Sequence, residues 1–153
     1  AAIHLAEHGF NVRIHGESQW KSELAGTAAA ECWHGWVDSG DQQSAAFRAA
    51  SVSLNIGSFA APDMLNMRAF DIPAAGGVLI SDDESALHDA FDIGSEALAF
   101  KKIDELPAIV SGILADPARR TSIAAAGRAR VEKDHSWNVW WNWAEARLRE
   151  RFN

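Results

Sequence analysis

The stretch DMLNMRAFDIPAAGGVLIS, residues 63–81, decides the fold, because a helical pattern in it runs directly into the pattern of a buried strand. We expect the helix over about 64–75, with Asp63 as its N-cap and Pro73 kinking it or ending it early. The run GVLIS, 77–81, is short, continuous and apolar, as in strands that a parallel sheet buries on both faces. The stretch therefore predicts one helix–strand unit of an α/β protein.

Helical and strand patterns alternate on both sides of this stretch. Such alternation predicts a Rossmann-like parallel sheet with helices on both faces. No low-complexity linker divides the chain, so residues 1–153 are expected to form a single domain. Strands are expected at 10–16, 33–37, 51–57, 77–81 and 96–100. Helices are expected at 1–8, 38–50, 64–75, 81–91, 102–116, 118–134 and 136–152, with Asp38, Ser39 or Asp41 capping the second and Ser136 the last.

The composition narrows the possible functions. The formal net charge of -7 argues against a general nucleic-acid binder, which needs Lys and Arg to displace counterions from phosphates. Cys32 is the only cysteine, so an internal disulfide and a cysteine metal site are excluded, and a reducing cytoplasm is the expected compartment. His4 and His8 have the spacing of two helix ligands, but no third ligand lies nearby in sequence, so no metal is predicted. No run approaches the ~18 apolar residues that a membrane span needs.

The segment 57–63 is a candidate ligand zone, since parallel sheets bind ligands beyond the carboxyl ends of their strands. A helix that begins there would aim its first amides at an anion. Asp63 and Asp71 are separated by a little over two helical turns, so both can face the same side. Arg68 is placed to brace Asp71 or to reach a phosphate. A cap, an intrahelical ion pair and a tight turn explain the same residues without any ligand.

Five pieces of the sequence, taken in order, resemble the C-terminal domain of two-lobed glycosyltransferases of the GT-B fold. The likeness is greatest to the spore-maturation CgeB-like group, whose pattern runs roughly R-x-F-E-I-x-A-x-G, then a strand, an acidic turn and G-x-E. The broader glycogen-synthase type carries two glutamates, with seven residues between them, at the places of Asp63 and Asp71. The resemblance covers about residues 9–143. The pieces are WHGWVD (33–38), AAFRAASVSLNI (45–56), MRAFDIPAAGGVLISDDESALHDAF (67–91), GSEALAF (94–100) and AAAGRARVEKDHSW (124–137).

The resemblance implies that the chain binds a nucleoside-diphosphate sugar as the donor for glycosyl transfer to an unknown acceptor. Asp71 would hold the ribose hydroxyls of the donor, because the two oxygens of a carboxylate suit a vicinal diol. Asp63 would approach the transferred sugar, and Arg68 would neutralise phosphate or fix Asp71. The other donor-binding residues that the resemblance implies are Met64, Leu65 and Asn66 near the diphosphate, Trp36 and Val37 at the base, and Gly16 where the nucleotide comes close.

The sequence departs from the family in several places. Asp71 is one methylene shorter than the family's glutamate, and the Arg and Lys pair that binds phosphate in the broader family has no match. The chain begins at Ala1 inside a helical pattern, so the domain's first strand and the N-terminal acceptor lobe are expected to be missing. This chain alone is therefore not expected to catalyse glycosyl transfer. A non-catalytic docking domain, or half of a sugar-nucleotide epimerase of the same architecture, fits the same scaffold.

Four of the seven tryptophans lie in the last predicted helix, 136–152. Trp137, Trp140 and Trp141 form one helical stripe with Ala144. Packing in the core is the favoured interpretation of this stripe. The alternative is that the helix crosses to the missing lobe, in which case the isolated chain would expose the stripe and self-associate.

Overall fold

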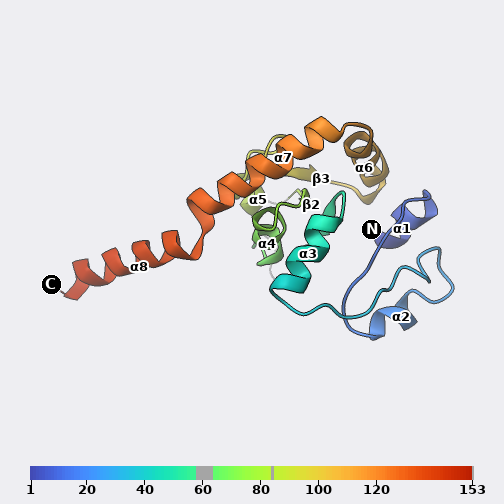
Figure 1. The fold of residues 1–153 in the computed structure, drawn as a ribbon, viewed down its shortest axis with the longest axis horizontal. Coiled ribbons are helices and arrows are strands. Elements are labelled where there is room, and N and C mark those ends of the chain that lie inside the picture. The colour runs from blue at the N-terminus through green and yellow to red at the C-terminus, as the bar shows by residue number, and fades with distance from the viewer. Residues whose placement is uncertain (58–63, 84, 153) are drawn as a thin grey trace.

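The computed structural model describes residues 1–57, 64–83 and 85–152, where helices surround a small sheet (Figure 1). The predicted α/β class is confirmed. The strands are β1 Ser53–Asn55, β2 Leu79–Asp82 and β3 Leu98–Phe100. The helices are α1 Ala2–Glu7, α2 Gln19–Glu23, α3 Asp41–Ala49, α4 Arg68–Ala74, α5 Ser85–Ala90, η1 Ile103–Glu105, α6 Leu106–Ala115, α7 Pro117–Arg130, η2 Val131–His135 and α8 Trp137–Phe152.

The three strands form one parallel sheet in the order β1-β2-β3. Ser53 lies opposite Leu79, and Ile80 lies opposite Leu98. Parallel neighbours need crossover connections, and in the chain α4 lies between β1 and β2 while α5 lies between β2 and β3. The sheet therefore has the helix–strand alternation that the sequence predicts.

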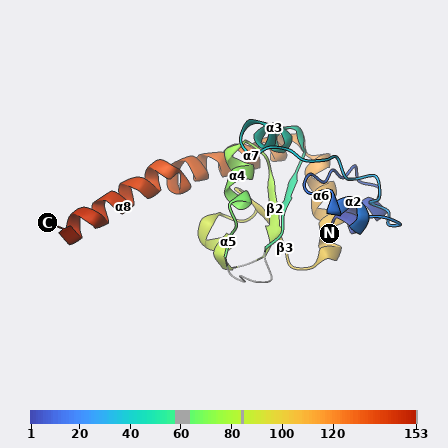
Figure 2. The same ribbon diagram turned by 90° about the horizontal axis from the view of Figure 1, so that it is seen from below.

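Apolar clusters cover both faces of the sheet, because successive strand side chains point to opposite sides. Val78 and Ile80 join the cluster that contains Leu5 and residues of α6, and Leu79 joins the cluster of α4 and α5. Figure 2 shows α6 on one side of the strands and α4 and α5 on the other. The predicted two-sided covering is confirmed.

The two predicted N-terminal strands are much shorter than expected. Residues 10–16 and 33–37 meet in an isolated parallel bridge between Ile14 and Trp33, outside the three-stranded sheet. The amide of Ile14 donates to the carbonyl of Cys32 at 2.7 Å, and the amide of His34 donates to the carbonyl of Ile14 at 2.9 Å. A pair of segments without further neighbours gains little from regular ladder pairing, which is consistent with the loss of strand structure here.

Two of the helix starts described next differ from the prediction, and the third agrees with it. The helix expected over 64–75 begins only at Arg68, so the predicted start at Met64 is wrong, and Asp63 lies outside the described residues. The helix that follows 33–37 has Gly40 as its N-cap, with a positive φ of 90°, and none of its predicted capping side chains bonds there. The last helix is capped as expected, since the amide of Val139 donates to Ser136 Oγ at 3.4 Å.

The C-terminal helix projects away from the body of the protein (Figure 1). Its side chains are exposed, with Trp137 at 72% and Trp141 at 65% of full accessibility. The favoured expectation of core packing is therefore wrong for this chain. The cause is the junction: helix α7 passes into one π-helical turn, η2, and the chain then leaves the sheet instead of folding back over it.

Candidate functional site

The carboxyl ends of β1 and β2 are joined by a polar chain of contacts. Both oxygens of Asp82 accept from the amide of Gly57, at 3.1 and 2.9 Å. Ser81 Oγ donates to Asp82 Oδ1 at 3.0 Å and accepts from Asn55 Nδ2 at 3.2 Å. The Oδ1 atom of the buried Asn55 has no partner in the described part of the chain. The Asp82 carboxylate is therefore already engaged in holding two strand ends together.

Asp83 joins three elements at the same edge. Its amide donates to the carbonyl of Phe100 at 2.9 Å, its Oδ1 contacts His88 Nε2, and Lys101 Nζ lies 3.5 Å from its Oδ2. The pKa of Asp83 is lowered, chiefly by the hydrogen bond from His88, and the charges of His88 and Lys101 add to that effect against a smaller opposing effect of burial. Asp83 is thus a structural carboxylate at this edge.

The first amides of α4 donate hydrogen bonds to acceptors within the chain. Asn66 Oδ1 accepts from the amide of Arg68 at 3.1 Å, and the carbonyl of Asn66 accepts from the amide of Ala69 at 3.1 Å. The amide of Phe70 donates to the carbonyl of Met67 at 2.9 Å. Because these first amides all have acceptors within the chain, they are not free to receive a diphosphate. Asn66 Nδ2 also lies 3.4 Å from the carbonyl of Ile56, which ties the helix start to the end of β1.

Asp71 lies in the first turn of α4 and faces a pocket of about 270 Å³ between α3, α4 and α7. Burial raises the pKa of this carboxyl group, and the charge of Arg68 opposes that rise. Burial without a hydrogen-bonded partner disfavours the ionised form. The lining residues are Gly40, Gln43, Ser44, Arg48, Asp71, Ala74, Ala75 and Arg128.

Met64 and Leu65 lie in a different hollow, which is more open. It has a volume of about 360 Å³ and lies between the segment before α4, helix α5 and η2. Phe70 and His135 also line it, and their rings lie 5.1 Å apart. The structure therefore does not bring Met64 and Leu65 into the pocket of Asp71.

The predicted base-pocket residues lie in the N-terminal half. The amide of Gly16 donates to the carbonyl of Gly35 at 3.0 Å, and the carbonyl of Gly16 accepts from Trp33 Nε1 at 3.2 Å. Gly16 has a positive φ of 148°, and an added Cβ would lie 3.2 Å from the ring of Trp20, so a larger residue would be strained there. Trp36 is 62% exposed, and its Nε1 donates to Asp38 Oδ1 at 3.1 Å. Val37 is half-buried.

Of the predicted donor residues that the structure describes, only Asp71 lines the pocket between α3, α4 and α7. Arg68 is exposed on the same helix. The pocket adds two basic residues that the sequence did not single out, Arg48 and Arg128. Both lie within quoted pieces of the chain, but isolated arginines on helices carry no signal of a site. No described set of three or more His, Cys, Asp or Glu residues is arranged to hold a metal ion.

The fold defines a class of protein: an α/β domain with a three-stranded parallel sheet, like the C-terminal half of a GT-B glycosyltransferase. The C-terminal domain of the group 1 glycosyl transferase LpcC from Francisella tularensis superposes with a TM-score of 0.61 at 12% identity, over 78% of this chain and 62% of that one. The chain belongs to the glycosyl transferase-like family, whose model matches residues 2–145.

Two further solved structures are similar to the chain. Both are of HepE from Anabaena, one in complex with UDP-glucose and one in complex with UDP, and each is 16% identical. Their TM-scores are 0.61 and 0.67, over 86% and 95% of this chain but only 37% and 43% of HepE. The chain thus spans about two fifths of the length of HepE. No curated protein matches it, and no helix among the described residues is long and apolar enough to cross a membrane.

Proposed function

We propose that this chain is the nucleotide-sugar-binding half of a two-lobed glycosyltransferase that transfers a sugar to an acceptor, closest to the CgeB-like group. Asp71 carries the proposal. It is the described residue of the resemblance that lines the pocket between α3, α4 and α7, it lies on the helix before the central strand, and its carboxylate makes no hydrogen bond or ion pair with another described residue. A carboxylate in that state can accept both hydroxyls of a ribose.

The ligand class rests on the family and on two structural neighbours. The family match covers nearly the whole chain, and HepE was solved with UDP-glucose and with UDP. By analogy we assign a nucleoside-diphosphate sugar to this chain, with Gly16, Trp36 and Val37 toward the base. Asp63, Met64, Leu65, Asn66 and Arg68 remain part of the proposed donor site.

We further propose that the acceptor lobe lies outside this chain and docks on α8, so that residues 1–153 bind donor but do not turn over. The exposed apolar face of α8 supports this, because an apolar face of that size is normally covered. The same face supports a second candidate function, a non-catalytic docking domain. The proposed compartment is the cytoplasm, where the lone Cys32 would stay reduced.

Titration separates the two functions. UDP-, GDP- and ADP-sugars are titrated into the chain by calorimetry, with thermal protection as a second readout. One of them is expected to bind, and Asp71→Ala is expected to weaken that binding at least tenfold, since it removes the acceptor of the ribose hydroxyls. If no nucleotide sugar binds, the docking function is favoured. If a longer protein keeps its activity with both Asp63→Ala and Asp71→Ala, the assignment of these two residues is wrong.

A further inference from the structure

The sheet has a free edge at β1. Among the described residues this strand pairs only with β2. The amide of Ser53 donates to the carbonyl of Val78 at 2.8 Å, so the backbone groups of Ser53 face β2. Consecutive residues of a strand direct their N–H and C=O groups to opposite edges, so those of Leu54 face away from β2. A row of backbone groups of this kind is a template on which another strand can pair.

A second row of unpaired backbone groups lies in the N-terminal segment 10–16. The amide and the carbonyl of Ile14 both pair with the segment 32–34. The neighbouring residues Arg13 and His15 therefore direct their backbone groups the other way, and no described residue accepts from their amides. Figure 2 shows the N-terminal segments, in blue, on the side of β1 that is away from β2. The sheet and this segment thus each offer an unpaired edge.

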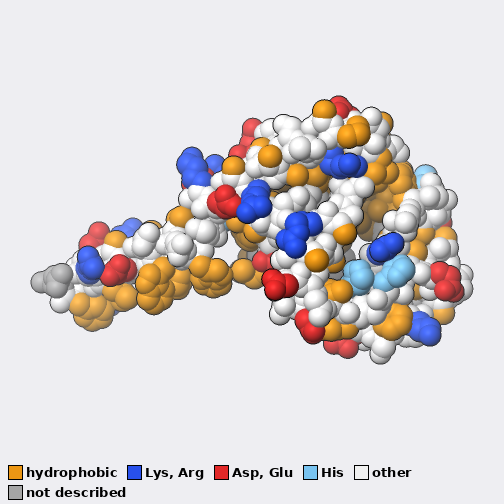
Figure 3. All heavy atoms as spheres, viewed as in Figure 1, with side chains coloured by type: hydrophobic (Ala, Val, Ile, Leu, Met, Phe, Trp, Pro, Cys, Tyr) orange, Lys and Arg blue, Asp and Glu red, His pale blue; other side chains and the backbone are white. Residues whose placement is uncertain are grey.

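The two edges lie over the same apolar cluster. Val12 of the segment and Leu54 of β1 are half-buried, and both pack against the cluster that contains residues of β2 and α6. Of the described apolar residues of 32–37, none joins this cluster, so the segment 10–16 lies between 32–37 and the sheet. In Figure 3 apolar side chains are visible in a hollow between α3 and the N-terminal segments. A strand placed there would complete the burial of both half-buried side chains.

The end of β1 holds a further unsatisfied group. Asn55 is 1% exposed, and its Oδ1 receives no hydrogen bond from a described residue. Its Nδ2 donates to Ser81 of β2 at 3.2 Å. Because the oxygen and the nitrogen of an amide group point to different sides, Oδ1 is directed away from that contact with β2. Buried acceptors normally have a donor, and a further strand beside β1 can supply one.

We propose that an extended segment of the longer two-lobed protein, outside residues 1–153, inserts between β1 and the segment 10–16 as a strand parallel to β1. The direction follows from the pairs on either side, since β1 with β2 and Ile14 with Trp33 are both parallel. The inference rests on the part of the proposed function that places further chain outside residues 1–153. In support, this chain covers less than two thirds of each of the three structural neighbours.

The site defines the chemistry of the strand that it accepts. Backbone groups of the inserted strand would pair with Leu54 on one side and with Arg13 and His15 on the other. Every second side chain would be apolar, because it faces the cluster against which Val12 and Leu54 pack. The inserted strand would also extend the isolated bridge at Ile14 into regular pairing, since the segment 10–16 would then have neighbours on both sides.

Hydrogen exchange resolved to single amides tests the inserted strand, in residues 1–153 and in the longer protein. In residues 1–153 the amides of Arg13, His15 and Leu54 are expected to exchange as unpaired amides do. In the longer protein they should exchange at least about a hundredfold more slowly, because the inserted strand accepts from them. The amide of Ser53, which donates to Val78, is the internal control and should be protected in both. If the three amides exchange equally fast in both proteins, the inserted strand is overturned.

A proline at position 13 tests the same pairing through stability. Arg13→Pro removes the side chain and the N–H, whereas the matched control Arg13→Ala removes only the side chain. In residues 1–153 the two variants should melt within about 3 °C of each other, since that N–H has no partner there. In the longer protein Arg13→Pro should melt at least about 5 °C below Arg13→Ala, because a strand between two neighbours loses a hydrogen bond. Equal melting of both variants in the longer protein would contradict the inserted strand.

The outcomes separate the inference from the proposed function, because neither measurement needs a ligand. If no nucleotide sugar binds but the three amides are protected in the longer protein, the donor function is overturned and the inserted strand stands. If a nucleotide sugar binds while the amides stay unprotected in the longer protein, the inserted strand alone is overturned. Protection that appears in residues 1–153 as their concentration rises would assign the strand to a second copy and overturn its assignment to the longer protein.

Discussion

Gly127 of α7 lies directly against the backbone at Glu96, just before β3. A Cβ built on Gly127 would lie 2.4 Å from the carbonyl oxygen of Glu96 and 3.3 Å from Cβ of Pro73. The helix can therefore approach α4 and the sheet this closely only because residue 127 has no side chain. The contact sets the depth at which α7 lies, and with it the position of Arg128 at the pocket.

Gly127→Ala is expected to destabilise the chain by about 1–3 kcal/mol, because the methyl group meets backbone that must shift. Urea unfolding followed by circular dichroism measures the change in free energy. Gly112→Ala in α6 is the matched control: a Cβ there meets nothing within 4 Å. Alanine is the better helix former, so this control is expected to gain about 0.5–1 kcal/mol. Equal effects of the two substitutions would contradict the close approach at Gly127.

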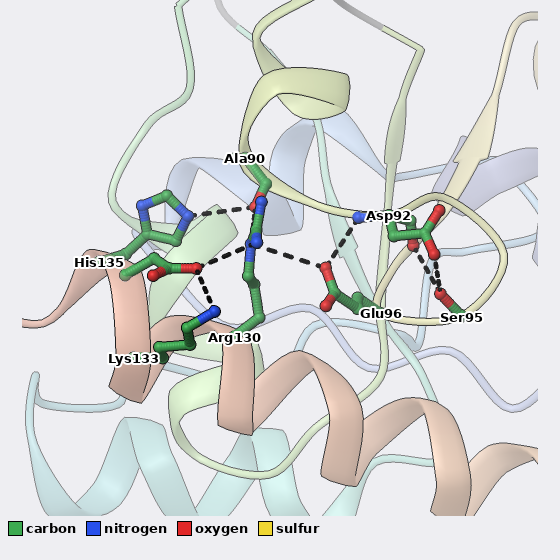
Figure 4. Close-up of polar contacts among 8 residues, drawn as sticks. Ala90, Asp92, Ser95, Glu96, Arg130, Lys133 and His135 are labelled. Carbon is green, nitrogen blue, oxygen red and sulfur yellow. Dashed lines mark hydrogen bonds and ion pairs between the residues drawn. The ribbon is translucent and has the colours of Figure 1, made fainter.

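The carbonyl of Ala90 is a second fixed point, at the end of α5 (Figure 4). Arg130 Nε donates to it at 2.9 Å, and His135 Nε2 lies 3.1 Å from it. Arg130 also pairs with Asp134 at 3.0 Å and lies 3.7 Å from Glu96. These contacts hold the π-helical turn to the body and so fix the point from which α8 leaves.

Arg130→Met is expected to cost about 1–3 kcal/mol, because it keeps the apolar stem but removes charge-assisted hydrogen bonds from half-buried acceptors. The exposed Lys133→Met, whose Nζ lies 4.0 Å from Asp134, should cost less than about 0.5 kcal/mol. Thermal unfolding of both variants checks this. If the two melt alike, the contacts of Arg130 contribute nothing to stability.

The parts of the fold that follow from local pattern were predictable from the sequence. The run 77–81 gave the central strand, and Ser136 gave the last cap. The start of α4 was not predictable. The side chain of Asn66 accepts from the amide of Arg68, so the helix begins at Arg68 and not at Met64. The apolar pattern of the sequence is compatible with a start at either residue. The sequence of helix α8 predicts a core helix because it has an apolar stripe. Such a stripe does not indicate whether the same domain or another surface covers it.

The candidate site was predictable only in part. Asp71 stood out because of its helical spacing from Asp63 and because it matches the second acidic residue of the family motif. Arg48 and Arg128 did not, since their convergence depends on how α3 and α7 pack around α4. Contacts between helices that are distant in sequence belong to the tertiary structure, and neither composition nor residue spacing predicts them.

Asp71→Asn is expected to be at least as stable as the wild type near neutral pH, although it loses donor binding. Burial raises the pKa of Asp71, so the folded chain binds more protons than the unfolded chain in the range just above the ordinary value of 3.8. Stability therefore falls as pH rises through that range, and asparagine removes this loss. Functional groups often carry such a cost in stability.

Asp82→Asn provides the contrast for this prediction. The Asp82 carboxylate accepts twice from the amide of Gly57 and once from Ser81, so its replacement should cost about 1–3 kcal/mol. Urea unfolding of the wild type and both variants, measured from pH 4 to pH 8, separates the two roles. A clear loss of stability in Asp71→Asn at neutral pH would contradict the unpartnered carboxylate in the pocket.

The tryptophan face of α8 should contribute to association rather than to folding. Figure 3 shows apolar side chains along one side of the projecting helix. Trp140 of this helix is 51% exposed. Trp140→Gln is therefore expected to change the free energy of unfolding by less than about 0.5 kcal/mol. Phe91→Ala, in the core at 1% exposure, is the contrast and should cost about 3–5 kcal/mol.

The same face is expected to make the isolated chain self-associate as its concentration rises. Sedimentation velocity on the wild type and on a triple variant, Trp137→Gln, Trp140→Gln and Trp141→Gln, measures this. Burial of three such rings contributes several kcal/mol at ~25 cal/mol per Å², so the triple variant should stay monomeric where the wild type does not. Asn142→Ala is the control on the same helix and should associate like the wild type. A wild type that stays monomeric at all concentrations would leave the acceptor lobe, and not a second copy, as the partner that α8 requires.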